Sequence, residues 1–207
     1  MKRQARSLAL PSRAAMKTLL RLSAAIDRVT TLIGHAVSWL ILVAVLISAG
    51  NAVIRKAFDM SSNAWLELQW YLFSAVSLLA ASYTLQRNDH IRIDIISNLL
   101  PKAARNWIDL FGHFFMLMPF VILMIYEAYP FVMTSIAQWE HSANAGGLLL
   151  WPVKALLLAG FLLLALQGVS EIIKRIAVMR GLIADPHEGS GTYQIAEDIT
   201  VAPEKRL

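Results

Sequence analysis

The stretch RNDHIRIDII, at residues 87–96, gathers charged and imidazole side chains at a spacing that could bind a metal ion or move a proton. His90, Arg92 and Asp94 alternate with isoleucines, a period of two that is also typical of a half-buried strand. No second strand is predicted to pair with it, and a lone strand is not stable. No predicted cavity surrounds it either, so we expect a connecting segment rather than a metal or catalytic site.

Isolated carboxylates in apolar sequence are the next candidates. Glu67 lies about one turn into a predicted helix, where the helix dipole favours a negative charge. It is therefore either a helix-start residue at the headgroup level or a contact to a partner subunit. An ion site is a third alternative, although one carboxylate alone makes a poor cation site. Glu127 is expected to hydrogen-bond neighbouring tyrosine hydroxyls or to pair with Lys154.

Histidines raise the possibility of a cofactor. His35 and His113 lie in different apolar blocks, and two facing imidazoles could ligate one b-type haem iron. A lone histidine on a helix is more often hydrogen-bonded to a neighbour, so the pattern permits haem without indicating it. The chain has no cysteine, which excludes thiolate metal sites, disulfides and a CxxCH haem attachment. Glu140, His141 and Ser142 are adjacent on a predicted loop and do not form a nucleophile–base pair, so no enzyme activity is expected.

Hydrophobic blocks define the elements that must position these residues. Of the 207 residues, 57% are hydrophobic and 16% charged, against roughly 25% charged in ordinary soluble domains. A helix needs about 20 mostly apolar residues to cross a bilayer. The sequence therefore predicts an all-α integral membrane protein with a four-helix domain at residues 29–176. Its spans are expected at residues 29–54, 64–86, 108–134 and 148–173. No nucleotide motif is present, and no nucleic-acid partner is expected.

The flanks of these blocks predict the orientation. Residues 1–28 are basic and predict either an amphipathic helix on the membrane surface or a solvated tail. Residues 177–207 are predicted to be a flexible tail. Lys and Arg also gather between the second and third blocks but are absent from residues 135–150, which places both termini in the cytoplasm. The tryptophans agree with this orientation. Near the outer boundary lie Trp65, Trp70, Trp139 and Trp151, and near the inner boundary lies Trp107. Trp39 lies deeper and is expected to pack inside the bundle.

Four stretches in the same order resemble one family. NAWLELQWYLF (63–73), DHIRIDII (89–96), HSANAGGLLLWPVKALLLAGF (141–161) and ALQGVSEIIKRI (165–176) are similar to the small membrane subunit of tripartite ATP-independent periplasmic (TRAP) transporters. The resemblance covers about residues 25–180. It implies an accessory subunit of the bacterial inner membrane that braces a large permease subunit and helps to dock a periplasmic substrate-binding protein. Uptake would be sodium-coupled, of an organic acid or related solute, with no cofactor in this subunit.

The resemblance also implies which residues contact partners. In the second helix the matching positions are Glu67, Gln69 and Trp70. In the inner loop they are His90, Arg92 and Asp94. In the outer loop and the start of the fourth helix they are Ser142, Gly146, Gly147, Trp151 and Pro152. Ala143 stands where the family often has proline. Two alternatives stay open: an electron-transfer subunit that binds haem through His35 and His113, and a small autonomous channel that uses Glu67 and Glu127. Membrane lipids are expected partners in every case.

Overall fold

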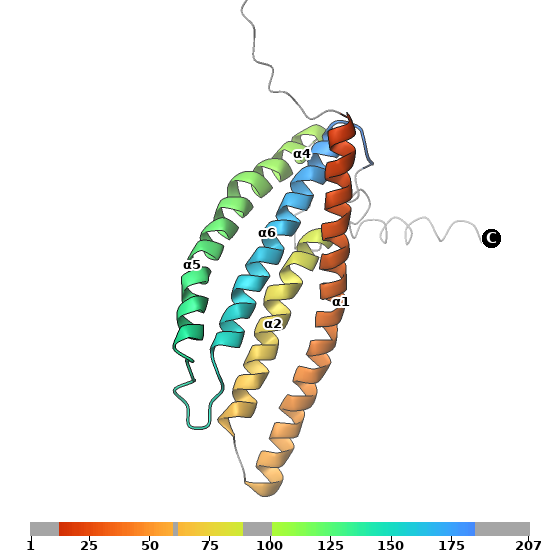
Figure 1. Cartoon of the computed structure of the whole chain (residues 1–207). Coiled ribbons are helices and arrows are strands. Elements are labelled where there is room, and N and C mark those ends of the chain that lie inside the picture. Colours follow the sequence, from red (N-terminus) through yellow and green to blue (C-terminus); the bar gives the residue numbers. More distant parts are fainter. Residues whose placement is uncertain (1–12, 60–61, 89–100, 185–207) are drawn as a thin grey trace, which may run out of the picture.

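A computed structural model describes residues 13–59, 62–88 and 101–184 of the chain, and these are almost entirely helical (Figure 1). The elements are α1 (Arg13–Phe58), α2 (Asn63–Arg87), α4 (Lys102–Phe111), the π-helical turn η1 (Gly112–Leu117), α5 (Met118–Ala137) and α6 (Trp151–Met179). The chain runs from α4 through η1 into α5 as one long helix. Within the described part the predicted all-α fold is confirmed.

Three of the helices are long and apolar enough to cross a membrane: Ala15–Phe58, Ala103–Ala137 and Trp151–Met179. They correspond to the first, third and fourth predicted spans. The helix α2 has 25 residues, which is long enough to span but less apolar. A fourth crossing and the cytoplasmic placement of the termini therefore stay predictions.

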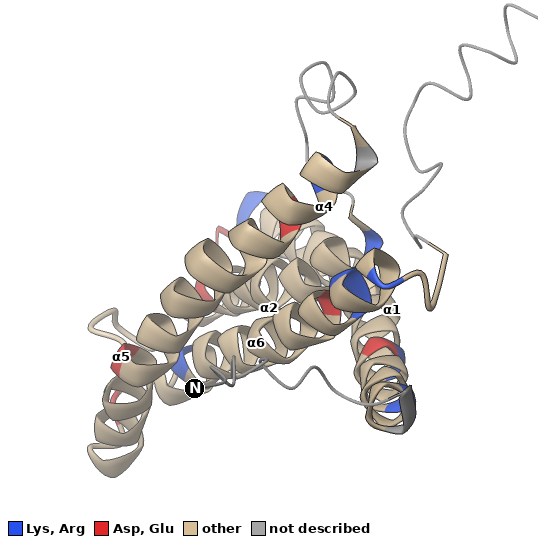
Figure 2. Cartoon of the chain, turned by 90° about the horizontal axis from the view of Figure 1, so that it is seen from above, with Lys and Arg blue, Asp and Glu red and all other residues tan. Residues whose placement is uncertain are grey.

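Three of the helices form a compact group, and the fourth packs on its side. α1, α2 and α6 pack against one another, and α5 packs on α6. Both views place α6 and α2 between α5 and α1 (Figures 1 and 2). Residues 14–28 belong to α1, which continues for 46 residues without a break. Residues 14–28 are thus helical and continue into the first span without a turn; their position relative to a bilayer stays a prediction.

Close helix crossings depend on glycine. A Cβ on Gly160 of α6 would lie 2.9 Å from the Cβ of Leu78 and 3.0 Å from its backbone oxygen. A Cβ on Gly34 of α1 would lie 2.5 Å from the Tyr83 ring. Small residues that let backbones approach are typical of helix contacts in membranes, where lipid removes the hydrophobic driving force for association.

Gly160→Ala is expected to push α6 away from α2 and to lower stability by about 1–3 kcal/mol, the usual cost of overpacking. Thermal unfolding in mild detergent measures this loss. Gly50→Ala is the matched control, because a Cβ there meets nothing within 4 Å and alanine favours the helix. Equal stability of the two variants would contradict the close α2–α6 contact.

Tryptophans lie mostly on the surface of the chain. Trp139, Trp70 and Trp107 are 67%, 63% and 63% exposed. Trp39 is 70% exposed, so the expectation that it packs inside the bundle is wrong. Its side chain points away from the other described helices and is available to lipid or to another protein.

Candidate functional site

The first polar site joins α2 to loop 138–150, which connects α5 to α6; we call it the loop junction. The Glu67 side chain accepts hydrogen bonds from three donors of this loop. Asn144 Nδ2 donates to Oε1 at 2.8 Å, the Leu148 N–H donates to Oε2 at 2.6 Å, and the Ser142 hydroxyl also donates to Oε1. Glu67 is only 4% exposed. One carboxylate therefore organises a loop 75 to 81 residues further along the chain.

The loop is folded tightly against this carboxylate. Its backbone closes through the Ser142 N–H bonded to the Leu148 oxygen at 2.9 Å and the Leu150 N–H bonded to the Glu140 oxygen at 2.9 Å. A Cβ on Gly147 would lie 2.5 Å from the Ser142 Cβ and 2.9 Å from Glu67 Oε1, so no side chain fits there. Gly146 has φ +71°, which glycine adopts without strain.

Two further side chains of α2 hold the loop. Asn63 Nδ2 donates to the Ala145 oxygen at 3.0 Å, and the Tyr71 hydroxyl donates to the Leu149 oxygen at 2.7 Å. Because these acceptors are backbone carbonyls, the loop conformation depends on α2 as well as on its own sequence.

An ion pair connects the start of the loop to α6. Lys154 pairs with Glu140, and its Nζ lies 4.0 Å from the centroid of the Phe131 ring. The expected pairing of Lys154 with Glu127 is therefore wrong. The hydrogen bond from Lys154 holds the pKa of Glu140 below its ordinary value. Because folding lowers this pKa, the pair stabilises the loop above the ordinary carboxyl pKa and is lost as the pH falls through the lowered one.

The remaining predicted partner-interface residues are dispersed. Gln69 Nε2 donates to the Ser48 hydroxyl of α1 at 3.0 Å, so this side chain is engaged within the chain. Trp70 is exposed, whereas Trp151 and Pro152 are half-buried at the start of α6. Of the predicted residues that the structure describes, it thus brings Glu67 together with Ser142, Gly146 and Gly147 of the loop, and it places Gln69 and Trp70 outside this contact. His90, Arg92 and Asp94 lie outside the described residues.

The haem alternative finds no support in the described helices. The His35 ring packs on Tyr83 of α2 with 5.7 Å between ring centroids. His113 Nδ1 lies 2.6 Å from the Asp109 oxygen of its own helix. The two imidazoles therefore have separate neighbours, His35 on α2 and His113 on its own helix. Within the described ranges, no three His, Asp or Glu side chains cluster as metal ligands would.

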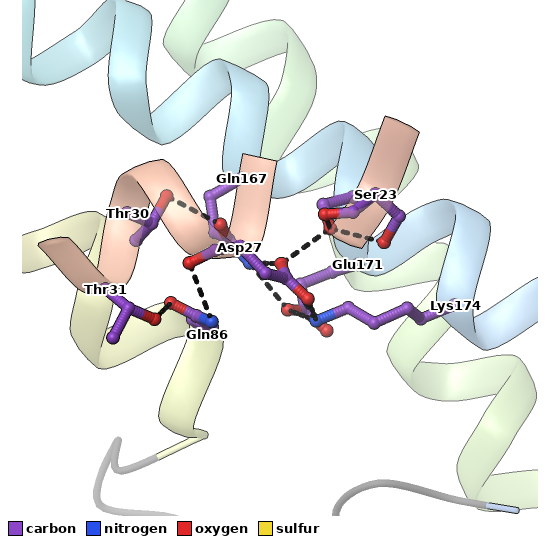
Figure 3. Close-up of polar contacts among 9 residues, drawn as sticks. Ser23, Asp27, Thr30, Thr31, Gln86, Gln167, Glu171 and Lys174 are labelled. Carbon is purple, nitrogen blue, oxygen red and sulfur yellow. Dashed lines mark hydrogen bonds and ion pairs between the residues drawn. The ribbon is translucent and has the colours of Figure 1, made fainter. Parts of the chain in front are cut away.

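A second polar site, which the sequence did not predict, lies between α1 and α6 (Figure 3). We call it the helix junction, and its residues are Ser23, Asp27 and Thr30 of α1 and Gln167, Ser170, Glu171 and Lys174 of α6. Gln167 is fully buried at its centre. Its Nε2 donates to Asp27 Oδ1 and to Glu171 Oε1, both at 2.9 Å, and its Oε1 accepts from Thr30 Oγ1 at 2.9 Å.

Charges at the helix junction are paired. Lys174 Nζ lies 3.2 Å from Asp27 Oδ2 and 2.5 Å from Glu171 Oε1. The Ser170 hydroxyl lies 2.8 Å from Asp27 Oδ1 and 2.7 Å from the Ser23 hydroxyl. Buried charges are tolerated only when paired and hydrogen-bonded, and this network meets that condition. Its arrangement fastens α1 to α6 and offers no open position for a solute.

Two neighbouring contacts extend this fastening to the other helices. Gln86 Nε2 of α2 donates to the Asp27 backbone oxygen at 3.2 Å. Arg175 of α6 forms an ion pair with Asp109 at 2.9 Å and donates to Asn106 Oδ1 at 2.9 Å, which ties α6 to α4. All four long helices are thus joined by polar contacts near this end.

The polar spacing along α1 and α6 was a usable signal for the helix junction. Ser23, Asp27 and Thr30 fall at i, i+4 and i+7, and Gln167, Glu171 and Lys174 do the same, so each set lies on one helical face. Nothing in the sequence alone pairs one set with the other.

Comparison with known proteins finds a family that matches this chain. The model of the family "Tripartite ATP-independent periplasmic transporters, DctQ component" matches residues 44–178, more than half of the chain. The chain belongs to this family. No curated protein matches it. DctQ proteins are the small membrane components of TRAP transporters and work with a large permease and a substrate-binding protein, so this chain is a transporter subunit of the membrane and not an enzyme. The matched residues include the whole loop junction and the α6 half of the helix junction.

Proposed function

We propose that this DctQ protein braces the large permease subunit in the bacterial inner membrane and presents loop 138–150 to the periplasmic substrate-binding protein. The transporter would take up an organic acid or a related solute with sodium. The observation that carries the docking role is the loop junction: a buried carboxylate holds a surface loop in one conformation.

The surface of the loop suits protein recognition. Trp139 is 67% exposed and His141 is exposed beside it. Exposed aromatic residues supply much of the binding energy at protein interfaces. Because the backbone beneath them is already ordered, binding would lose little conformational entropy.

The bracing role rests on the outer surface of the helices. Both polar junctions are engaged within the chain, so neither lines a path for a solute. By contrast, α5 exposes large apolar side chains along its length (Phe120, Ile122, Leu123 and Ile136). Such a surface needs lipid or another membrane protein against it.

The four-span topology is supported by the course of α2. Its first two turns reach the loop junction through Asn63 and Glu67, and its last turn reaches Asp27 of α1 through Gln86. α2 therefore runs beside the spanning part of α1, and we propose that it is the fourth crossing, with both chain termini in the cytoplasm.

Trp139→Ala is expected to weaken binding of the substrate-binding protein by tenfold or more, the loss of about 1.4 kcal/mol or more typical of an interfacial tryptophan. The assay measures association of the binding protein with the transporter complex in nanodiscs. Trp107→Ala, equally exposed on α4 far from the loop, is the control. If both variants bind like the wild type, the docking role of the loop is wrong.

A further inference from the structure

Glu127 is an acidic side chain on the surface of a membrane-spanning helix. It lies on α5 within the span Ala103–Ala137 and is exposed. Lys154, the nearby cation, is engaged with Glu140, and among the described residues no hydrogen bond or ion pair of Glu127 is found. Ionisable groups in membrane spans are costly and almost always face protein or water rather than lipid. This carboxylate therefore calls for a partner outside the described part of the chain.

The depth of Glu127 follows from contacts on either side of it. Phe131 lies beside Lys154 of α6, and Phe120 packs on Phe161 of α6 with 6.0 Å between ring centroids. Glu127 falls between these two contacts along α5, so it is level with a part of α6 that lies inside the span Trp151–Met179. Its position is deeper than the Glu140–Lys154 pair near the loop.

Glu127 belongs to a regular seam of exposed side chains that runs along η1 and α5, beside the residues that α5 buries. The residues that α5 buries are Val121, Ala128, Val132 and Ser135. The seam lies on another face and repeats at alternating intervals of four and three, with all its members exposed (Met116, Phe120, Leu123, Glu127, Pro130 and Thr134). This spacing is that of a helix which packs lengthwise against another helix.

We infer that this seam is the surface on which a transmembrane helix of the large subunit packs, and that this helix carries an Arg or Lys opposite Glu127. The inference rests on the proposed function and adds to it the face and the charge of the contact. Charge complementarity selects the occupant. Lipid tails cover the apolar members of the seam but leave the carboxylate without a partner. A neighbouring helix covers the apolar side chains, and a basic residue on that helix pairs with the carboxylate.

A photo-crosslinking amino acid placed at position 123 tests the inference in the complex co-expressed with its large subunit. Leu123 and the control position Leu46 on α1 are 56% and 63% exposed, so both are accessible. Position 123 is expected to give a covalent adduct with the large subunit, and position 46 a much weaker one. An adduct from position 46 alone, an adduct between two copies of this chain, or no protein adduct at position 123 would each overturn the inference.

Charge reversal gives an independent readout. Glu127→Lys is expected to lower the yield of co-purified large subunit at least tenfold, and Glu127→Gln to lower it less. Thermal unfolding of the variant chain alone is expected to match the wild type, since no described residue pairs with Glu127. Normal co-purification of the large subunit with Glu127→Lys would overturn this inference and leave the proposed function standing. If the wild-type chain captures no large subunit, the proposed function fails and the inference with it.

Discussion

Glu67→Ala is expected to release loop 138–150 and to abolish most solute uptake while the helices stay folded. Three donors of the loop lose their common acceptor: Ser142 Oγ, Asn144 Nδ2 and the Leu148 N–H. A buried donor left without a partner costs about 1–3 kcal/mol; because Asn144 is exposed and can bond water instead, a local loss of about 1–3 kcal/mol is expected. Hydrogen exchange of loop amides measures it directly, and uptake by the reconstituted three-component system measures its consequence.

Two further variants make this expectation specific. Glu67→Gln keeps one acceptor oxygen but turns an amide donor towards the loop, so an intermediate loss is expected. Trp65→Ala alters an exposed side chain in the same turn of α2 and should leave loop protection unchanged. If the loop amides exchange as slowly in Glu67→Ala as in Trp65→Ala, the carboxylate does not hold the loop.

Lys174→Met is expected to lower the free energy of unfolding by about 3 kcal/mol or more. It removes the ammonium group that lies between the Asp27 and Glu171 carboxylates, and breaking a buried ion pair from one side typically costs about 3–5 kcal/mol. Denaturant unfolding in detergent micelles gives the value. The same variant should also loosen α1 from α6, seen as a larger distance between spin labels on the two helices.

A double variant separates this charge effect from simple loss of packing. Asp27→Asn combined with Lys174→Met removes one of the uncompensated charges, so part of the lost stability should return, as in a double-mutant cycle. Lys17→Met, at an exposed position of α1, is the control and should change stability by no more than about 0.5 kcal/mol. Additive effects of Asp27→Asn and Lys174→Met would contradict a direct pairing.

The helices themselves were readable from the sequence because their cause is local. Long apolar blocks need internal hydrogen bonding in a bilayer, and only helices supply it within one segment. The continuation of α1 through residues 14–28 has an equally local cause, since that stretch contains neither Gly nor Pro to end a helix. The basic charges of this stretch predict either a surface helix or a solvated tail, and charge alone does not break a helix.

Side-chain pairings were less accessible. Glu67 was identified as a contact site, but its partners proved to be in the chain itself, 75 to 81 residues away. Lys154 lay within plausible reach of both Glu127 and Glu140, and spacing along the sequence does not decide between two carboxylates. Asp27 and Gln167 sit on polar faces that are visible in the sequence, yet their hydrogen bond spans 140 residues. In each case the deciding information is the packing of helices, which no short motif contains.

The separation of these partners has a consequence for how the protein is made. At about 5–20 residues per second, the ribosome needs about 4–16 s to reach the Leu148 amide after Glu67 has been added, and about 7–28 s to reach Gln167 after Asp27. During these intervals α1 and α2 carry polar groups whose final partners do not yet exist. We expect the nascent helices to be retained beside the insertion machinery, where water is accessible, until loop 138–150 completes the loop junction and α6 completes the helix junction.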